Sequence, residues 1–89
     1  MKQPYLEVTF RHGRPLAAYY YLPRKPGDKS VSTRRVEPGL VIDFAKGGRP
    51  IGIEITTPGK FSLVALNRVL RELGFTAATR GELAPVIAA

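Results

Sequence analysis

Hydrophobic and polar positions alternate with a period of two over residues 36–55, which read VEPGLVIDFAKGGRPIGIEI. Two apolar runs are joined there by Gly47-Gly48, a pattern typical of a β-hairpin. A tight turn at these glycines predicts that Lys46 faces Arg49. It also places six large apolar side chains on one face of the hairpin: Leu40, Ile42, Phe44, Ile51, Ile53 and Ile55. A shift of one residue would expose all six to water, so the register is well specified.

The N-terminal pattern predicts two more strands. Residues 5–10 (YLEVTF) alternate, and residues 16–22 (LAAYYYL) are rich in tyrosine, which favours strands. The facing of the second strand depends on the turn between them. A two-residue turn directs one set inward: Ala17, Tyr19 and Tyr21. A three-residue turn directs inward the other set, which is more apolar and is favoured: Leu16, Ala18, Tyr20 and Leu22.

A polar strand is predicted over residues 31–37, after an exposed loop at 23–29 that is rich in Pro, Gly and charge. Neither face of this strand is apolar, and its charged side chains discourage edge-to-edge pairing, so we expect it near an edge of the sheet. Pro38-Gly39 then suits a type II turn. That turn fits two-residue hairpins poorly, which favours a looser or bulged connection.

The period becomes helical over residues 62–73 (SLVALNRVLREL). Ser62 is the expected N-cap and Gly74 the residue that ends the helix. Leucines at spacings of three and four form an apolar stripe, which we expect to cover the six-residue hairpin face: Leu63, Leu66, Leu70 and Leu73. Further along, Thr79 and Glu82 have the spacing of a capping box.

These elements predict an α+β fold, with a mainly antiparallel sheet of about five strands and one C-terminal amphipathic helix packed on one face. Residues 1–89 are expected to form a single small domain. After the capping box, Pro85 should stop any further helix. No helix then remains for the other face of the sheet, and a twofold dimer would bury that face where it is apolar.

Composition narrows the class of protein. The 89 residues include no cysteine, which excludes disulfides and thiolate metal sites. No run of about 18 apolar residues is present, so we expect no membrane-spanning helix and no membrane partner. The N-terminal residues MKQPYLEVTF lack the apolar segment of a signal peptide. We therefore expect a cytoplasmic protein, and no motif predicts a cofactor.

The chain is basic, with fourteen Lys and Arg, seven Asp and Glu, and a formal net charge of +7. Such a charge raises encounter rates with any polyanion. The basic residues are dispersed, mostly over predicted loops, so general surface charge is the competing interpretation. The candidates for nucleic-acid contact are Arg24, Lys25, Arg34 and Arg35.

The predicted register ties two carboxylates together. Asp43 faces Gly52, so Glu54 is its diagonal neighbour, with Cβ atoms about 7–8 Å apart. Such a pair can bind a divalent ion or share a proton in acid–base chemistry, and Gly52 leaves open space beside it. We favour the alternative of an ion pair with Arg34 or Arg35, because a two-residue turn would place Arg34 opposite Asp43.

Tyr19, Tyr20 and Tyr21 alternate, so at least one ring leaves the core whichever facing holds. Exposed tyrosine beside arginine is enriched in protein interfaces, and it can also stack on unpaired bases. His12, the single histidine, lies in a predicted turn beside Gly13. We expect it to be solvated, because a metal site needs several convergent ligands.

A tyrosine-rich strand, a polar loop, VEPGLVIDF, a glycine turn, GIEI and a leucine-rich helix follow one another in this chain. This order resembles the YuzE-like family of small bacterial domains of unknown function. The resemblance covers residues 17–57 and extends to Gly74, with its most specific parts at Pro38-Gly39, Asp43 and residues 52–55. Family members often carry an acidic residue and glycine in the hairpin turn, where this chain has KGG.

The resemblance implies a family-like core over about residues 17–74, a C-terminal extension at 75–89, and no established reaction. For some relatives it implies a toxin–antitoxin-like gene pair.

Together these observations favour a non-enzymatic protein-interaction module that self-associates as a dimer or binds a partner protein. The candidate interaction residues are Tyr19, Tyr20, Tyr21, Arg34, Arg35, Asp43 and Glu54. The alternative is a basic nucleic-acid-binding protein. The least favoured function is a carboxylate-based metal or hydrolase site at Asp43 and Glu54.

Overall fold

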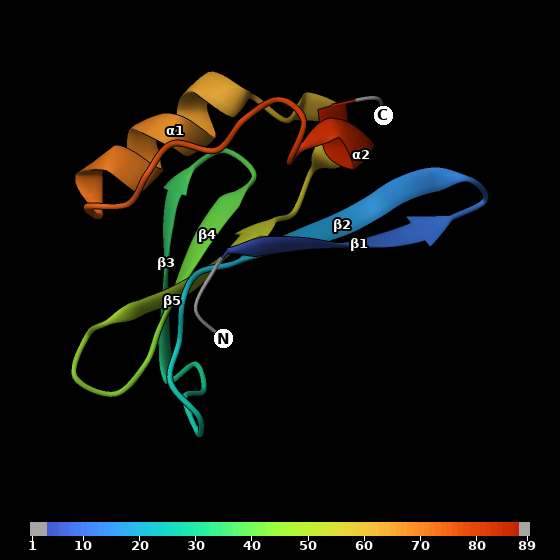
Figure 1. Ribbon diagram of the computed structural model, residues 1–89. Helices are drawn as coiled ribbons and strands as arrows, with labels where there is room; N and C mark the ends of the chain where they lie inside the picture. Colours follow the sequence, from blue (N-terminus) through green and yellow to red (C-terminus); the bar gives the residue numbers. More distant parts are fainter. Residues whose placement is uncertain (1–3, 88–89) are drawn as a thin grey trace.

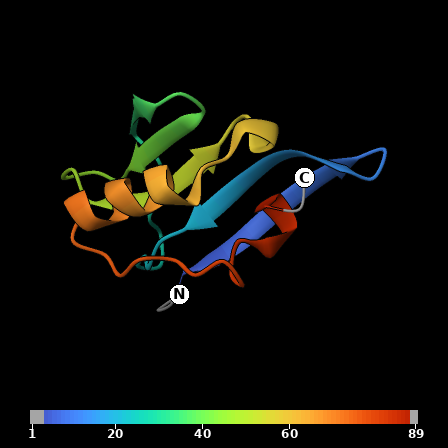
Figure 2. The same cartoon turned by 90° about the horizontal axis from the view of Figure 1, so that it is seen from above.

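The computed structural model describes residues 4–87. Their elements, in chain order, are β1 (Tyr5–Arg11), β2 (Arg14–Tyr21), β3 (Ser32–Glu37), β4 (Leu40–Phe44), β5 (Pro50–Ile55), the 3-10 turn η1 (Pro58–Lys60), α1 (Leu63–Glu72) and α2 (Ala84–Ile87). The strands form an antiparallel sheet in the order β1-β2-β5-β4-β3, and both helices lie on one side of it (Figures 1 and 2). The predicted α+β fold is confirmed. Within this part of the chain, no helix is long and apolar enough to cross a membrane.

The side of the sheet beneath the helices holds the hydrophobic core. Its centre is the apolar face of β4 and β5, where Ile42 and Ile53 are 1% and 0% exposed. The buried side chains of α1 recur at spacings of three and one, on the helix face turned to the sheet: Leu66, Val69 and Leu70. The predicted caps hold, since Ser62 Oγ accepts the N–H of Ala65 at 3.1 Å and Gly74 has a φ of +85°.

The β4–β5 hairpin keeps its predicted register only as far as Asp43, which pairs with Gly52. Beyond it, Phe44 pairs with Pro50 because the register shifts by one residue. The turn is also longer than two residues, since the N–H of Ala45 donates to the carbonyl of Arg49 at 2.8 Å. The predicted pairing of position 46 with position 49 is therefore wrong. Two consecutive glycines with positive φ, at 47 and 48, allow this longer turn.

A register shift also decides the facing of β2. The β1–β2 turn consists of His12 and Gly13, both with positive φ, so the predicted three-residue turn is wrong. However, Leu16 is an extra residue on β2 and reverses the facing that a two-residue turn would produce. The favoured set is therefore buried, namely Ala18, Tyr20 and Leu22. Leu16 itself is the exception, because it is 53% exposed near the end of the hairpin.

The polar strand β3 lies at an edge of the sheet, as predicted. It joins β4 through a turn in which Gly39 has a φ of +82°, the sign that a type II turn requires. A bulge at Val36 then shifts the register, which confirms the bulged connection. Arg34 consequently pairs with Ile42, so the prediction that it lies opposite Asp43 is wrong.

The segment after α1 contributes two fully buried side chains to the core. Leu83 and Val86 are 0% and 1% exposed. Thr79 and Glu82 form the predicted capping box, in which each side chain accepts the backbone N–H of the other residue, at 3.1 and 2.9 Å. Pro85 lies inside α2, so the prediction that it stops the helix is wrong. A first-turn proline is tolerated because its missing N–H has no partner in the helix.

Asn67 of α1 holds this C-terminal segment in place. Its side-chain amide donates to the carbonyl of Ala78 at 3.1 Å and accepts the N–H of the same residue at 2.7 Å. We expect Asn67→Ala to lower the free energy of unfolding by about 1–3 kcal/mol, because two backbone groups of a buried residue lose their partner. Urea denaturation measures this loss. A loss no greater than that of Glu72→Ala, at an exposed position of the same helix, would contradict the role of Asn67.

Candidate functional site

The side of the sheet opposite the helices carries two rows of side chains that cross all the strands. In the order β1-β2-β5-β4-β3, one row consists of Tyr5, Tyr21, Gly52, Asp43 and Thr33. The other row consists of Glu7, Tyr19, Glu54, Val41 and Arg35. We call these ten residues the open face. Within residues 4–87, neither helix covers it, because both lie on the other side (Figure 1).

Tyr19 dominates the centre of the open face. Its hydroxyl donates to Asp43 Oδ2 at 2.7 Å, so its ring spans the middle strand. A Cβ added at Gly52 would overlap that hydroxyl oxygen and the adjoining ring atoms. Burial first, and then the hydrogen bond to Asp43, raises the pKa of Tyr19 above its ordinary value. The space that the sequence suggested beside Gly52 is therefore filled by an aromatic ring.

Arg24, from the loop after β2, joins this aromatic group. Its guanidinium lies 4.9 Å from the centroid of the Tyr21 ring, and its Nη2 donates to the carbonyl of Ile51 at 2.7 Å. The same Nη2 lies 3.5 Å from the hydroxyl of Tyr19. Tyr21 also stacks on Tyr5 at 4.5 Å and meets Tyr19 edge-on at 4.6 Å. The three rings and the guanidinium therefore form a continuous cluster whose members hold one another in place.

The loop that carries Arg24 is held by an ion pair. Asp28 accepts two hydrogen bonds from Arg49, one of them at 2.9 Å from Nη2. Asp28 also accepts the N–H of Lys25 at 2.8 Å. The hydrogen bonds from Arg49 hold the pKa of Asp28 well below its usual range. This pairing ties the loop to the β4–β5 turn and so positions Arg24 beside the open face.

The two predicted carboxylates lie where the register placed them. Asp43 pairs with Gly52, and Glu54 pairs with Val41. The partner of Asp43 is the phenol of Tyr19, so the predicted ion pair with Arg34 or Arg35 is wrong. Among the described residues, no three His, Asp or Glu side chains lie close enough together to hold a metal ion. His12 is exposed in its turn, with a φ of +53°.

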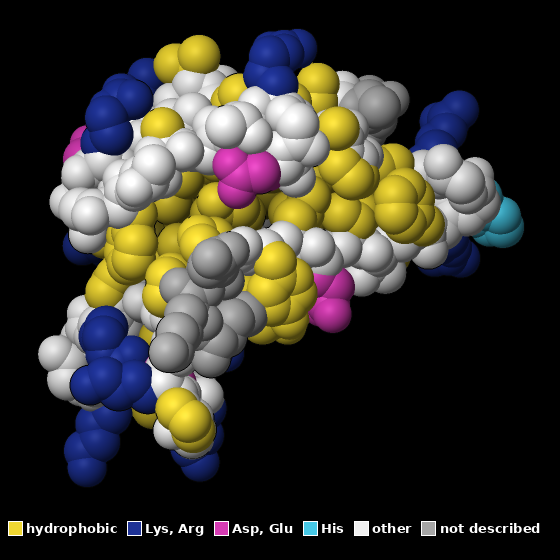
Figure 3. Space-filling model, viewed as in Figure 1, with side chains coloured by type: hydrophobic (Ala, Val, Ile, Leu, Met, Phe, Trp, Pro, Cys, Tyr) yellow, Lys and Arg dark blue, Asp and Glu magenta, His cyan; other side chains and the backbone are white. Residues whose placement is uncertain are grey.

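The four basic candidates do not form one surface. Arg24 is held beside the open face, and Lys25 is exposed in the loop beyond it. Arg35 belongs to the open face, but its neighbour Arg34 lies on the helix side, 5.4 Å from the ring centroid of Phe44. Figure 3 shows the Lys and Arg side chains dispersed around the periphery of the molecule.

The three consecutive tyrosines also divide between the two sides. Tyr20 belongs to the core and is 2% exposed. Burial, together with the nearby carboxylate of Glu82, raises the pKa of Tyr20 to about 12. Tyr5, which is 47% exposed, takes the corresponding place on the open face and was not among the candidates. The alternation of residues 5–10 leaves it on the face away from Leu6 and Val8, but only the register shift at Leu16 pairs it with Tyr21.

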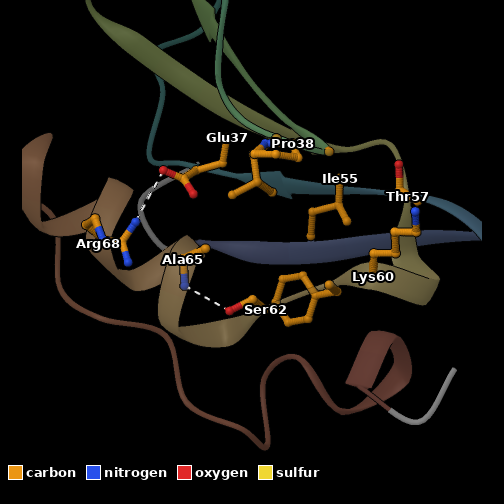
Figure 4. Close-up of a pocket in the computed structure, with 11 residues that line it drawn as sticks. Glu37, Pro38, Ile55, Thr57, Lys60, Ser62, Ala65 and Arg68 are labelled. Atoms are coloured by element: carbon orange, nitrogen blue, oxygen red, sulfur yellow. Dashed lines mark hydrogen bonds and ion pairs between the residues drawn. The ribbon is translucent and has the colours of Figure 1, made fainter.

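A separate depression of about 340 Å³ lies on the helix side, between the β3–β4 turn and the start of α1 (Figure 4). The ion pair between Glu37 and Arg68, at 3.3 Å, borders it on one side, and Lys60 lies opposite. The apolar residues that line it include Leu40, Ile55 and Phe61. Ser62 is a side chain here that could act as a nucleophile, but its hydroxyl oxygen already accepts the N–H of Ala65 as the cap of α1. Charged and apolar side chains therefore line the depression together.

The fold and the open face define a small α+β domain with one covered and one uncovered side of its sheet. Residues 17–57 match the family described as "Protein of unknown function (DUF2283)". No curated protein and no solved structure shows significant similarity to the chain. The matched segment runs from β2 to the end of β5 and includes Tyr19, Gly52 and Asp43. It therefore matches a small family of unknown function, which assigns no activity.

The contact between Tyr19 and Gly52 can be tested by adding a single methyl group. We expect Gly52→Ala to lower the free energy of unfolding by about 1–3 kcal/mol, because the new Cβ forces the ring away. Gly59→Ala is the matched control, since a Cβ there meets open space. In a Tyr19→Ala background, the Gly52 substitution should lose most of its cost. Urea denaturation of these variants measures the coupling, and equal costs in both backgrounds would rule it out.

The raised pKa values of Tyr19 and Tyr20 predict that the protein loses stability at alkaline pH. Burial raises the pKa of Tyr20 to about 12 and also raises that of Tyr19, whereas unfolded tyrosine ionises near about 10. Their contribution to stability is fully present below about pH 10 and is lost as the pH rises through the folded pKa, because the unfolded chain loses its protons first. Urea midpoints should therefore fall above about pH 10. The fall should be smaller in Tyr20→Phe, and an identical fall would refute the assignment.

Proposed function

We propose that this protein is a non-enzymatic interaction module that self-associates through the open face of its sheet. The observation that carries the proposal is the cluster of Tyr5, Tyr19 and Tyr21 with Arg24, beside the half-buried Val41, on a side that no helix of the described chain covers. Tyrosine and arginine are the residues in which interfaces are enriched. Because these side chains already hold one another, little conformational entropy remains to be lost on binding.

Charge supports a second copy as the partner. The open face holds one cation, Arg35, and three carboxylates: Glu7, Asp43 and Glu54. The adjoining loop adds Arg24, Lys29 and Asp28. This region is therefore not basic, although the chain as a whole carries +7. Two strongly cationic copies repel each other over most of their surfaces, so they approach best where the local charge is not positive. The same property disfavours this face as a binding surface for polyanions.

The size of the face sets the expected affinity. Its width across the sheet is about 19 Å, which is four strand spacings of about 4.8 Å. Its ten residues are fewer than the roughly 20–30 that each partner contributes to a specific interface of standard size. We therefore propose a dimer that dissociates in the micromolar range and not an obligate one.

The engagement of Asp43 supports a role without catalysis. A carboxylate pair that works in acid–base chemistry needs one member free to exchange a proton with a substrate. Here the carboxylate of Asp43 accepts the hydrogen bond of the Tyr19 phenol, and the ring of Tyr19 fills the space over Gly52. The resemblance to the YuzE-like family supports a second occupant for the open face, a partner protein from a toxin–antitoxin-like pair.

Val41 provides the direct test, because it lies within the open face. We expect Val41→Lys to convert a dimer into a monomer, since it adds a charge to each side of the proposed interface. Val64→Lys is the matched control, because Val64 is 70% exposed on the outer side of α1. Sedimentation velocity over a concentration series, with circular dichroism as a check of folding, distinguishes the two. A wild-type chain that stays monomeric at all concentrations would refute self-association.

The same purified proteins can be used to test the alternative function, nucleic-acid binding. It is favoured by the projecting end of the β1–β2 hairpin, where Arg11 and Arg14 lie beside the exposed Phe10 and Leu16 (Figure 1). Fluorescence anisotropy with labelled single-stranded RNA and duplex DNA, at about 50 and 200 mM salt, measures this binding. Binding that survives the higher salt and prefers one nucleic acid would replace the present proposal. Binding only at the lower salt would leave the dimer as the function.

A further inference from the structure

We infer that two copies of this chain meet face to face about a twofold axis parallel to β5, with Glu7 of one copy opposite Arg35 of the other. This inference rests on the self-association proposed above and specifies its geometry. The partner is a second copy of the chain, and the contact surface is the open face.

This geometry follows from one of the two rows of the open face, the row that carries most of the charged side chains. Across the sheet it reads Glu7 on β1, Tyr19 on β2, Glu54 on β5, Val41 on β4 and Arg35 on β3. An acidic side chain therefore lies at one end of the row and a basic side chain at the other. The two are separated by about 19 Å, four strand spacings, so they cannot pair within one chain.

A twofold axis along the middle strand reverses the strand order of the second copy. Strand β1 then lies over β3 of the partner, and β2 lies over β4 of the partner. This superposition forms the Glu7–Arg35 pair twice and places the ring of Tyr19 over Val41 twice, as an isologous interface requires. Packed sheets lie about 10 Å apart and cross at about 30°, and the long side chains of Glu7 and Arg35 can span the resulting offset.

The other in-plane twofold axis, perpendicular to the strands, does not use these charges. It would place each edge strand over its own copy. Arg35 would then face a strand whose open-face residues are Thr33 and Arg35, which include no carboxylate. The charge order across the sheet therefore selects the axis along β5.

One residue opposes the arrangement and so provides an independent check. Glu54 is exposed on the middle strand, close to the inferred axis, and would face its own counterpart. Two carboxylates that meet at an interface weaken it. Glu54→Gln should therefore tighten the dimer, whereas a general surface position would leave the dissociation constant unchanged.

Charge reversal tests the pairing itself. Glu7→Arg and Arg35→Glu should each weaken the dimer by about tenfold or more, because each creates two like-charge contacts. The double variant should return to within about threefold of wild type, because it restores both pairs in reverse. Arg34→Glu controls for Arg35→Glu, since it lies on the same strand but on the helix side. Glu72→Arg, exposed on α1, controls for the added charge of Glu7→Arg.

Sedimentation equilibrium of these variants separates the two levels of the proposal. A dimer that Val41→Lys disrupts, but in which the double variant is no tighter than the singles, would overturn the twofold geometry and keep self-association. Single charge reversals that weaken the dimer no more than their control variants would also overturn the twofold geometry and keep self-association. A monomeric wild-type chain would overturn both proposals. Rescue by the double variant, together with tightening by Glu54→Gln, is the expected result.

Discussion

The burial of the apolar β4–β5 face beneath α1 is the contact on which the rest of the structure depends. Ile42 and Ile53 from the strands and Leu66 and Leu70 from the helix are all 0–1% exposed and belong to one buried cluster. A chain of 89 residues supplies enough apolar surface for one such core. With one amphipathic helix and a short C-terminal segment as cover, the second side of the sheet is left to side chains that tolerate water.

The open face follows from that constraint. Its centre is held by a hydrogen bond between Tyr19 and Asp43 across a glycine, and by the stacking of Tyr5, Tyr21 and Arg24. These contacts fix the side chains of the open face, which do not pack against the hydrophobic core. The family match at residues 17–57 includes that centre but none of the helical cover. The matched strands bury their apolar side only when residues outside the match, from α1 and the C-terminal segment, pack against them.

Local pattern and turn chemistry were sufficient for most of the fold. The strands, the helix with its Ser62 cap, and the capping box at Thr79 and Glu82 were all predictable, because each depends on residues close together in the chain. Three register shifts were harder to locate. The extra residue at Leu16 leaves no signal of its own, and the Pro38-Gly39 turn indicated a bulge without giving its position at Val36. Each shift nevertheless moves every side chain beyond it to the opposite face.

The sequence by itself determined the α+β class, the apolar hairpin face and the diagonal placement of Asp43 and Glu54, since alternation and turn length act over a few residues. Only the tertiary structure decided which side chains meet across the open face. Tyr19 reaches Asp43 because β2 pairs with β5, and the bulge at Val36 puts Arg35, and not Arg34, on the open face. Strand order brings together residues more than twenty positions apart, and it is settled by which arrangement buries the core, a global property that no local pattern contains.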